Sequence, residues 1–297
     1  MPTPALLLCF ADELPLARRI AAASGMALAE VERHVFPDGE LRLRLPQQLP
    51  QRVALLRSLH GPNVKLLELL LTARTARTLG ARQLTLVAPY LAYMRQDIAF
   101  QPGEAISQTI VGEHLAQLFD AVLTIDPHLH RVATLAQAVP ARQALALTAA
   151  PLLGEWVFRQ CPDALLVGPD EESAQWIRAA ARAHGLEHAV CSKNRQGDHK
   201  VKITLPQVDV KGRAVVLLDD IASSGQTLAQ AAQALRAAGA QSVDVAVTHA
   251  LLAGDALQVM LQAGVGRVWS TDSVPHASNS VGIAGLLADA LASVAPA

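Results

Sequence analysis

Two adjacent carboxylates and a run of small residues stand directly after an apolar stretch in the last third of the chain. The stretch is Ala214–Leu218, and it is followed by Asp219, Asp220, Ile221, Ala222, Ser223, Ser224, Gly225, Gln226 and Thr227. Glycine lets the backbone approach an anion closely, and the free N–H groups at the start of a helix favour a phosphate. Two carboxylates would repel that anion unless they hold sugar hydroxyls or Mg²⁺. A capped turn explains one serine and one aspartate but not the whole string, so Asp219–Thr227 predicts a loop that holds a phosphate group.

Two segments of the first half carry polar side chains next to aromatic or apolar residues. Phe36-Pro37-Asp38-Gly39-Glu40 is a turn with one aromatic ring and two carboxylates, and by itself it is typical of a surface turn. Arg95-Gln96-Asp97 follows the apolar stretch Leu84–Ala88. Arg95 and Asp97 could form a surface ion pair, but a guanidinium can also stack on adenine or pair with a phosphate.

Three further segments follow apolar stretches and offer carboxylates, imidazoles or cations. They are Asp126-Pro127-His128-Leu129-His130, Gly168-Pro169-Asp170 and Lys193-Asn194-Arg195. His128 and His130 are two residues apart, so in an extended chain they face the same side. Imidazole is a poor first choice for Mg²⁺, which prefers oxygen ligands. A Lys-X-Arg pair taken alone is typical of a solvated charge run.

Short apolar stretches alternate with helical periodicity along the chain. Strands are predicted at Ala5–Phe10, Val53–Leu56, Leu84–Ala88, Ala121–Ile125, Ala164–Val167, Ala189–Cys191, Ala214–Leu218, Ser242–Val247 and Arg267–Ser270, and helices at Val64–Leu79, Ser107–Leu118, Ser173–His184 and Thr227–Ala238. This alternation indicates parallel sheets covered by helices on both faces. Ligands bind beyond the carboxyl ends of such strands, where the polar segments above are placed.

Composition excludes several classes of protein. The 297 residues are 51% hydrophobic and carry a net charge of −1, so no basic field favours nucleic acid, and the 3% aromatic content is too low for a base-stacking surface. Met1–Phe10 lacks the positive charge and the length of a secretory signal, and no stretch resembles a membrane span. Three widely spaced cysteines predict buried thiols in a reducing compartment, and we expect a cytoplasmic protein.

The string Asp219–Thr227 resembles the phosphoribosyl-pyrophosphate loop shared by type I phosphoribosyltransferases and ribose-phosphate pyrophosphokinases. The stretch around Arg95-Gln96 is similar to the ATP-contacting segment of the pyrophosphokinases, for which the transferases have no equivalent. Lys193-X-Arg195 is similar to the base of the pyrophosphokinases' catalytic loop. The chain is therefore identified as a member of the pyrophosphokinase family, closer to its short archaeal-like type.

The resemblance implies two similar phosphoribosyltransferase-like α/β domains, each with a mainly parallel sheet flanked by helices, which we expect at residues 1–143 and 144–297. It assigns ATP to Phe36, Asp38, Gly39, Glu40, Arg95 and Gln96. It assigns ribose 5-phosphate to Arg195, Asp219, Asp220, Ser223, Ser224, Gly225, Gln226 and Thr227. It further implies catalysis by Lys193 and Arg195, with Mg²⁺ near His128 and Asp170.

The activity that the resemblance implies is transfer of the diphosphoryl group of ATP to the C1 hydroxyl of ribose 5-phosphate. It also implies a homo-oligomer with the ATP site at a subunit interface, and no nucleic-acid or membrane partner. Two alternatives are a type I phosphoribosyltransferase and a non-catalytic regulatory homologue. Gln226 stands where the family more often has glycine, and Glu171-Glu172-Ser173 replaces a usually glycine-rich run, which leaves room for altered activity.

Overall fold

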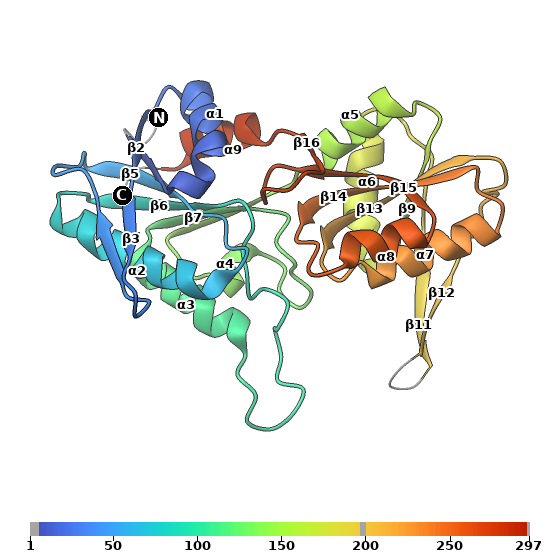
Figure 1. Ribbon diagram of the computed structural model, residues 1–297, viewed down its shortest axis with the longest axis horizontal. Helices are drawn as coiled ribbons and strands as arrows, with labels where there is room; N and C mark the ends of the chain where they lie inside the picture. Colours follow the sequence, from blue (N-terminus) through green and yellow to red (C-terminus); the bar gives the residue numbers. More distant parts are fainter. Residues whose placement is uncertain (1–5, 197–199, 296–297) are drawn as a thin grey trace. The chain divides into compact units, whose positions relative to one another are not determined.

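The computed structural model describes residues 6–196 and 200–295, and the side chains of residues 193–203 lie outside that description. The chain divides into two compact units, Met1–Leu147 with Ile283–Ala297, and Thr148–Gly282. Each unit is an α/β domain built on a six-stranded parallel sheet (Figure 1). The predicted fold class is therefore confirmed.

The first unit contains the sheet β2-β1-β5-β6-β7-β8. Its strands are β1 (Leu6–Cys9), β2 (Ala27–Glu30), β5 (Arg52–Leu56), β6 (Gln83–Ala88), β7 (Ala121–Ile125) and β8 (Gln143–Leu147). Its helices are α1 (Leu14–Ser24), α2 (Pro62–Thr78), α3 (Ser107–Leu118), α4 (Leu135–Ala138) and α9 (Ala284–Ser293). All residues of β6 and β7 are buried, because both faces of these central strands are covered. An antiparallel hairpin of β3 (Glu32–Val35) and β4 (Leu41–Arg44) is separate from this sheet.

The second unit contains the sheet β10-β9-β13-β14-β15-β16. Its strands are β9 (Leu165–Gly168), β10 (His188–Val190), β13 (Ala214–Ala222), β14 (Ser242–Ala250), β15 (Val265–Thr271) and β16 (Asn279–Val281). Its helices are α5 (Ala150–Gln160), α6 (Ala174–Arg182), α7 (Gln226–Ala237) and α8 (Ala256–Gln262). The antiparallel hairpin of β11 (Ser192–Gln196) and β12 (Lys200–Thr204) projects from this unit (Figure 1).

The two sheets have the same connectivity. In each, the first strand along the chain is second in the sheet, and the third strand along the chain lies beside it. By this order the loop between β5 and α2 corresponds to the loop between β13 and α7. Both loops end in a glycine with a left-handed backbone that precedes the helix, Gly61 (φ 61°) and Gly225 (φ 71°). The two units therefore share a strand–loop–helix feature at equivalent positions.

The division of the chain differs from the predicted domains 1–143 and 144–297. β8 starts at Gln143 and completes the first sheet, so the first unit runs to Leu147. The last helix, α9, packs against α1 in the first unit, and after it Arg52 and Gln83 donate hydrogen bonds to the carbonyls of Val294 (3.2 Å) and Ala295 (2.6 Å). These contacts place residues 283–297 in the first unit rather than the second.

Each of the predicted strands and helices overlaps an element of the structure, but the sequence patterns missed the two hairpins, the strands β2, β8 and β16, and the helices α1, α4, α5, α8 and α9. β13 also extends four residues beyond Leu218, because Ile221 and Ala222 continue to pair with β14. No helix among the described residues is long and apolar enough to cross a membrane. Cys9 and Cys191 are buried free thiols, and Cys161 is partly exposed.

Candidate active site

Three carboxylates gather at the carboxyl ends of two adjacent strands of the second unit. Asp170 is buried and lies two residues after the end of β9, and Asp219 and Asp220 lie in the second half of β13. Burial and the charges of Asp220 and Asp170 raise the pKa of Asp219 well above its ordinary value. Such mutual destabilisation of charge favours a bound cation or hydroxyl donors, and three carboxylates supply the oxygen ligands that Mg²⁺ prefers. The residues present therefore fit a divalent cation.

Asp170 is held in place by the turn that follows it. Its carboxylate accepts a hydrogen bond from the backbone N–H of Glu172, and its carbonyl accepts one from the Ser173 hydroxyl at 2.6 Å. Ser173 packs so tightly on Gly168 that a Cβ at Gly168 would meet its Oγ at 2.0 Å. Glu171 and Glu172 are exposed. The unusual run Glu171-Glu172-Ser173 thus forms a compact turn that fixes Asp170.

The phosphate loop of the second unit is shorter than predicted and consists of Ser223, Ser224 and Gly225. α7 begins at Gln226, so Gln226 and Thr227 occupy its first turn. The loop is anchored to the segment after β14, because the N–H groups of Leu252 and Ala253 donate to the carbonyls of Ala222 (2.9 Å) and Ser223 (3.0 Å). Ser224 and Gln226 are exposed. A helix start presented by a rigid loop of small residues is suited to binding an anion.

Lys193 and Arg195 occupy β11, where they pair with Ile203 and Val201 of β12. Two residues apart on a strand, these positions fall on one face of the hairpin. Their side chains lie outside the described part of the structure. Their assignment as catalytic cations stays a prediction.

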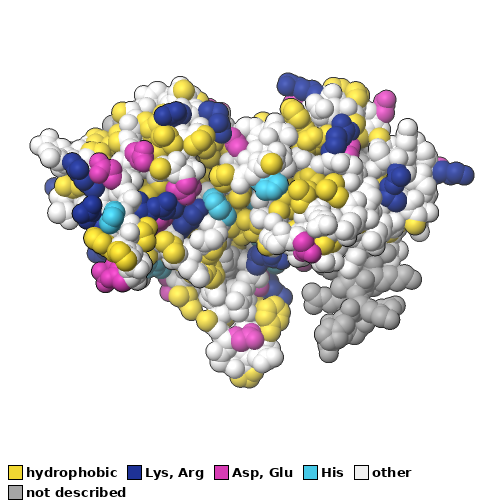
Figure 2. All heavy atoms as spheres, in the orientation of Figure 1, with side chains coloured by type: hydrophobic (Ala, Val, Ile, Leu, Met, Phe, Trp, Pro, Cys, Tyr) yellow, Lys and Arg dark blue, Asp and Glu magenta, His cyan; other side chains and the backbone are white. Residues whose placement is uncertain are grey.

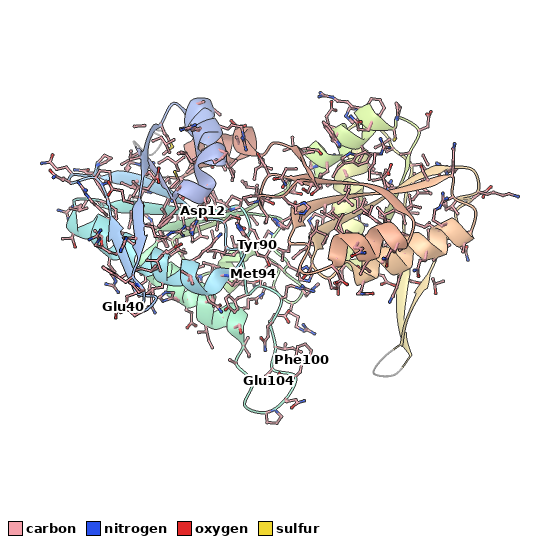
Figure 3. The ribbon with its side chains drawn as sticks, viewed as in Figure 1. Asp12, Glu40, Tyr90, Met94, Phe100 and Glu104 are labelled. Atoms are coloured by element: carbon pink, nitrogen blue, oxygen red, sulfur yellow. The ribbon has the colours of Figure 1, made fainter. Side chains whose placement is uncertain are left out.

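In the first unit, Phe36–Glu40 forms the turn of the β3–β4 hairpin, with Glu40 at its far end (Figure 3). Gly39 has a left-handed backbone (φ 91°), and the Asp38 carboxylate accepts a hydrogen bond from the N–H of Glu40 at 3.1 Å. The Phe36 ring is 37% exposed and packs edge-on against His34. Among the described residues, no hydrogen bond, ion pair or ring contact joins this turn to Arg95 or Gln96.

Arg95 and Gln96 lie in the long loop between β6 and α3, which starts near Tyr90 and Met94 and reaches out to Phe100 and Glu104 (Figure 3). Arg95 is exposed, whereas the Gln96 side chain accepts a hydrogen bond from the Ser107 hydroxyl at 3.2 Å. The surface pair Arg95–Asp97 considered above is not what the structure contains. Asp97 instead forms an ion pair with Arg131, at 2.6 Å.

His128 follows β7, and its ring packs edge-on against that of His130 with centroids 3.9 Å apart. The family resemblance assigns no role to His130, and the two-residue spacing of the histidines was the one sequence feature that indicated this contact. In the same unit, Arg131 was not singled out at all. No local pattern reveals that it pairs with a residue 34 positions earlier.

A buried ionic cluster in the first unit was also missed. It consists of Glu13 after β1, Arg57 after β5, and Lys65 and Glu68 in the first turns of α2, with the partly exposed side chains of Asp12 and Arg33 at its edge. Arg57 is 1% exposed and contacts all three carboxylates. Burial raises the pKa of Glu13 to about 7 and lowers that of Lys65 to about 8. Lone charged residues in a sequence are usually solvated, so nothing predicted this cluster.

Comparison with known proteins decides between the families that share the phosphate loop. The family model of the N-terminal domain of ribose phosphate pyrophosphokinase matches residues 5–118, and that of the phosphoribosyl transferase domain matches residues 146–282. The ribose-phosphate pyrophosphokinase of Methanopyrus kandleri is 35% identical over 290 residues, covering 96% of this chain and 98% of the relative. Ribose-phosphate pyrophosphokinase 2 of Archaeoglobus fulgidus is 35% identical, with 92% and 95% covered.

This chain belongs to the ribose-phosphate pyrophosphokinase family. The crystal structure of phosphoribosylpyrophosphate synthetase from Mycobacterium smegmatis superimposes with a TM-score of 0.84 and covers 97% of both chains at 24% identity, which supports the family's fold. The relatives with the higher identities are archaeal, as the similarity to the short type predicted. The N-terminal pyrophosphokinase domain sets the chain apart from type I phosphoribosyltransferases.

Proposed function

We propose that the chain catalyses the reaction of ATP with ribose 5-phosphate to give 5-phosphoribosyl 1-pyrophosphate and AMP. The sugar's C1 hydroxyl attacks the β-phosphorus of ATP, the bond from that phosphorus to the α-phosphate oxygen breaks, and the β,γ-diphosphoryl group moves as a unit. The observation that carries the proposal is the similarity to pyrophosphokinases over nearly the whole chain, together with a loop of small residues before α7 and the carboxylate cluster beside it. The chemistry needs alignment and charge neutralisation more than covalent help.

In this proposal the second unit holds the sugar phosphate. Ser223–Thr227 bind the 5-phosphate, and Asp219 and Asp220 bind ribose hydroxyls. Lys193 and Arg195 neutralise the transferring group. Phe36, Asp38, Gly39, Glu40, Arg95 and Gln96 of the first unit bind ATP. Asp170 and His128 would hold Mg²⁺, which would screen the phosphate charges when bound. A cytoplasmic location is part of the same proposal.

A direct assay tests the function. Purified protein is incubated with ATP, ribose 5-phosphate and MgCl₂, and AMP is measured by chromatography. We expect AMP to form only when all three are present. If no AMP forms, the transferase alternative is tested by incubating the protein with phosphoribosyl pyrophosphate and nucleobases and measuring the release of pyrophosphate. A protein that is inactive in both assays would favour the regulatory homologue.

Gly225→Ala is expected to raise the KM for ribose 5-phosphate at least tenfold while leaving that for ATP within twofold. A Cβ at this position would meet the carbonyl oxygen of Ala256 at 2.9 Å, and the left-handed backbone adds strain of about 1 kcal/mol for alanine. Gly61→Ala is the matched control, because Gly61 also precedes a helix with φ 61° but has open space around it. Steady-state kinetics that show equal changes in both variants would contradict this role of the loop.

We propose that the active form is at least a dimer, with the Phe36–Glu40 turn reaching the ATP site of a neighbouring subunit. The turn is exposed, and large hydrophobic side chains are exposed on the elements around it, Val35 (56%), Val64 (57%), Leu67 (46%) and Ile110 (57%). α2, which carries Val64 and Leu67, packs against both β4 and α3. Hydrophobic side chains are visible on the surface of this unit in Figure 2. Such apolar surface is typical of an interface.

Leu67→Lys combined with Ile110→Lys is expected to shift the protein toward monomers in sedimentation velocity and to raise the KM for ATP. Leu261→Lys is the control, because Leu261 is similarly exposed (47%) but lies on α8 of the second unit. A wild-type protein that sediments as a fully active monomer would exclude the proposed assembly.

A further inference from the structure

Two strand-end loops of the first unit are joined by one ion pair. The ATP loop, residues 89–106, follows β6, and the histidine loop, residues 126–134, follows the neighbouring strand β7. The guanidinium of Arg131 donates to Oδ1 of Asp97 at 2.6 Å. The ATP loop carries Arg95 and Gln96, and the histidine loop carries His128. The pair therefore links the proposed nucleotide contacts to the proposed metal-linked histidine.

The acidic partner of this pair is buried and depends on Arg131. The Asp97 side chain is 2% exposed, whereas that of Arg131 is 53% exposed. Asp97 Oδ2 is also buried, and it accepts no hydrogen bond within the described part of the chain. A buried carboxylate needs a compensating charge, because removal from water disfavours the ionised form. An ordinary surface ion pair has no such requirement, so this geometry points to a fixed connection between the loops.

The backbone on both sides of Arg95 is fixed as well. Gln108 at the start of α3 donates its side-chain amide to the carbonyl of Met94 at 2.9 Å and its backbone N–H to the carbonyl of Gln96 at 3.1 Å. With Asp97 tied to Arg131, the residues at 94, 96 and 97 are all fixed, and Arg95 between them is exposed. A rigid frame with one exposed cation is suited to presenting that cation to a ligand.

We propose that Asp97 and Arg131 are positioning residues for ATP. Their ion pair holds Arg95 and Gln96 at a fixed distance from His128, so that the first unit presents these side chains to the nucleotide in one arrangement. The proposal rests on the proposed function. Asp97 and Arg131 act through Arg95, Gln96 and His128, and their effect is on the binding of ATP rather than of ribose 5-phosphate.

The test is a double-mutant cycle with Asp97→Asn, Arg131→Gln and the double variant. The affinity for a non-hydrolysable ATP analogue with MgCl₂, measured by calorimetry without ribose 5-phosphate, and the KM for each substrate are compared with wild type. We expect each single variant to bind the ATP analogue about tenfold more weakly and to raise the KM for ATP about tenfold. The double variant should bind the analogue no more weakly than the single variant with the lower affinity. The KM for ribose 5-phosphate should stay within twofold of wild type in all three variants. Arg131→Lys should recover part of the loss.

Asp120→Asn is the matched control. Asp120 also pairs with an arginine of the first unit, Arg77 at 2.8 Å, but it directly precedes β7 and lies at the opposite end of that strand. Its loss should lower the melting temperature without changing the KM for ATP. If Arg131→Gln fails to fold, Asp97→Asn, which removes the buried charge itself, decides the question.

Three results would overturn the proposal. The first is an affinity of Asp97→Asn for the ATP analogue within twofold of wild type. The second is an equal rise in the KM values for both substrates. The third is a double variant whose fall in affinity is the product of the falls in the two single variants. A wild-type protein that binds the ATP analogue but forms no AMP would contradict the proposed function while leaving the binding cycle measurable.

Discussion

Lys193→Ala is expected to lower kcat by a factor of about 100 to 1,000 while the KM values for both substrates change little. The transferring diphosphoryl group gathers negative charge in the transition state, and a cation aimed at that charge contributes on the order of 3 kcal/mol to lowering the barrier. An effect confined to the transition state lowers kcat without changing ground-state binding. The hairpin that carries Lys193 is built from the strand pair β11–β12 alone, so replacing one residue should leave both sheets intact.

The measurement is a rapid-quench or steady-state assay of AMP formation at saturating substrates. Lys211→Ala serves as control, because Lys211 is an exposed lysine in a turn of the same unit. Arg195→Ala is expected to lower kcat as well and also to raise the KM for ribose 5-phosphate, since this residue is assigned to both roles. A Lys193→Ala protein with wild-type turnover and a wild-type melting profile would remove Lys193 from the mechanism.

Arg57→Met is expected to destabilise the first unit by about 3–5 kcal/mol. The guanidinium bonds Glu68 at 2.8 Å, Asp12 at 2.8 Å and Glu13 at 3.2 Å, and it lies 4.4 Å from the centre of the Phe10 ring. Methionine fills much of the volume but supplies no charge. Glu13 is then left buried without its guanidinium partner, and Glu68 keeps only its ion pair with Arg33 at 2.6 Å. Breaking a buried ion pair from one side is strongly destabilising.

The destabilisation should grow with pH. Burial raises the pKa of Glu13 from 4.5 to about 7 even with Arg57 present, so the folded state binds more protons than the unfolded state between these values, and this carboxyl's contribution to stability falls as pH rises through them. Besides Arg57, the charged groups around Glu13 are Asp12 and Lys65. Without Arg57 the carboxyl is protonated at still higher pH. The difference between variant and wild type is therefore expected to be smaller at pH 6 than at pH 8.

Urea unfolding followed by two probes locates the effect. The tryptophans, Trp156, Trp176 and Trp269, all lie in the second unit, so their fluorescence reports on that unit, whereas circular dichroism reports on both. Arg57→Met should shift the dichroism transition more than the fluorescence transition. Adding Glu13→Gln and Glu68→Gln to Arg57→Met should restore part of the stability, because it removes the buried charges. If Arg57→Met is as stable as wild type at pH 8, the charges of the buried carboxylates are not compensated by Arg57.

Periodicity was sufficient to predict the strands that position the candidate site of the second unit. Apolar runs predicted β9 and β13, and Asp170, Asp219 and the small-residue loop lie at or after their carboxyl ends, because the strands of a parallel sheet share one direction. The roles of these residues, which the family resemblance implies, stay a prediction. The hairpins were missed for a different reason. β3 is exposed throughout and reads as Glu-Arg-His-Val, with neither the alternation nor the apolar content of a strand packed on a core.

Long-range charge pairing was beyond the reach of sequence patterns. Arg57 and Asp12 are 45 residues apart, and Asp97 and Arg131 are 34 apart. Each looks like a solvated charge in its own window, and only the docking of strands and loops removes water from around it. The unit to which residues 283–297 belong was not predictable for the same reason, because a helical pattern does not indicate which sheet or helix the segment packs against.

The placement of α9 has a consequence for how the chain forms during synthesis. The first unit is interrupted by the continuous segment Thr148–Gly282 and is completed only by the residues that follow it. α1 precedes that segment, so it must keep its apolar face available until α9, which comes after the segment, has been translated and can cover it. The second unit has no such requirement, since all of its strands and helices are consecutive. Domains fold as units when their chain is complete, so the half that is translated first is the half that finishes last.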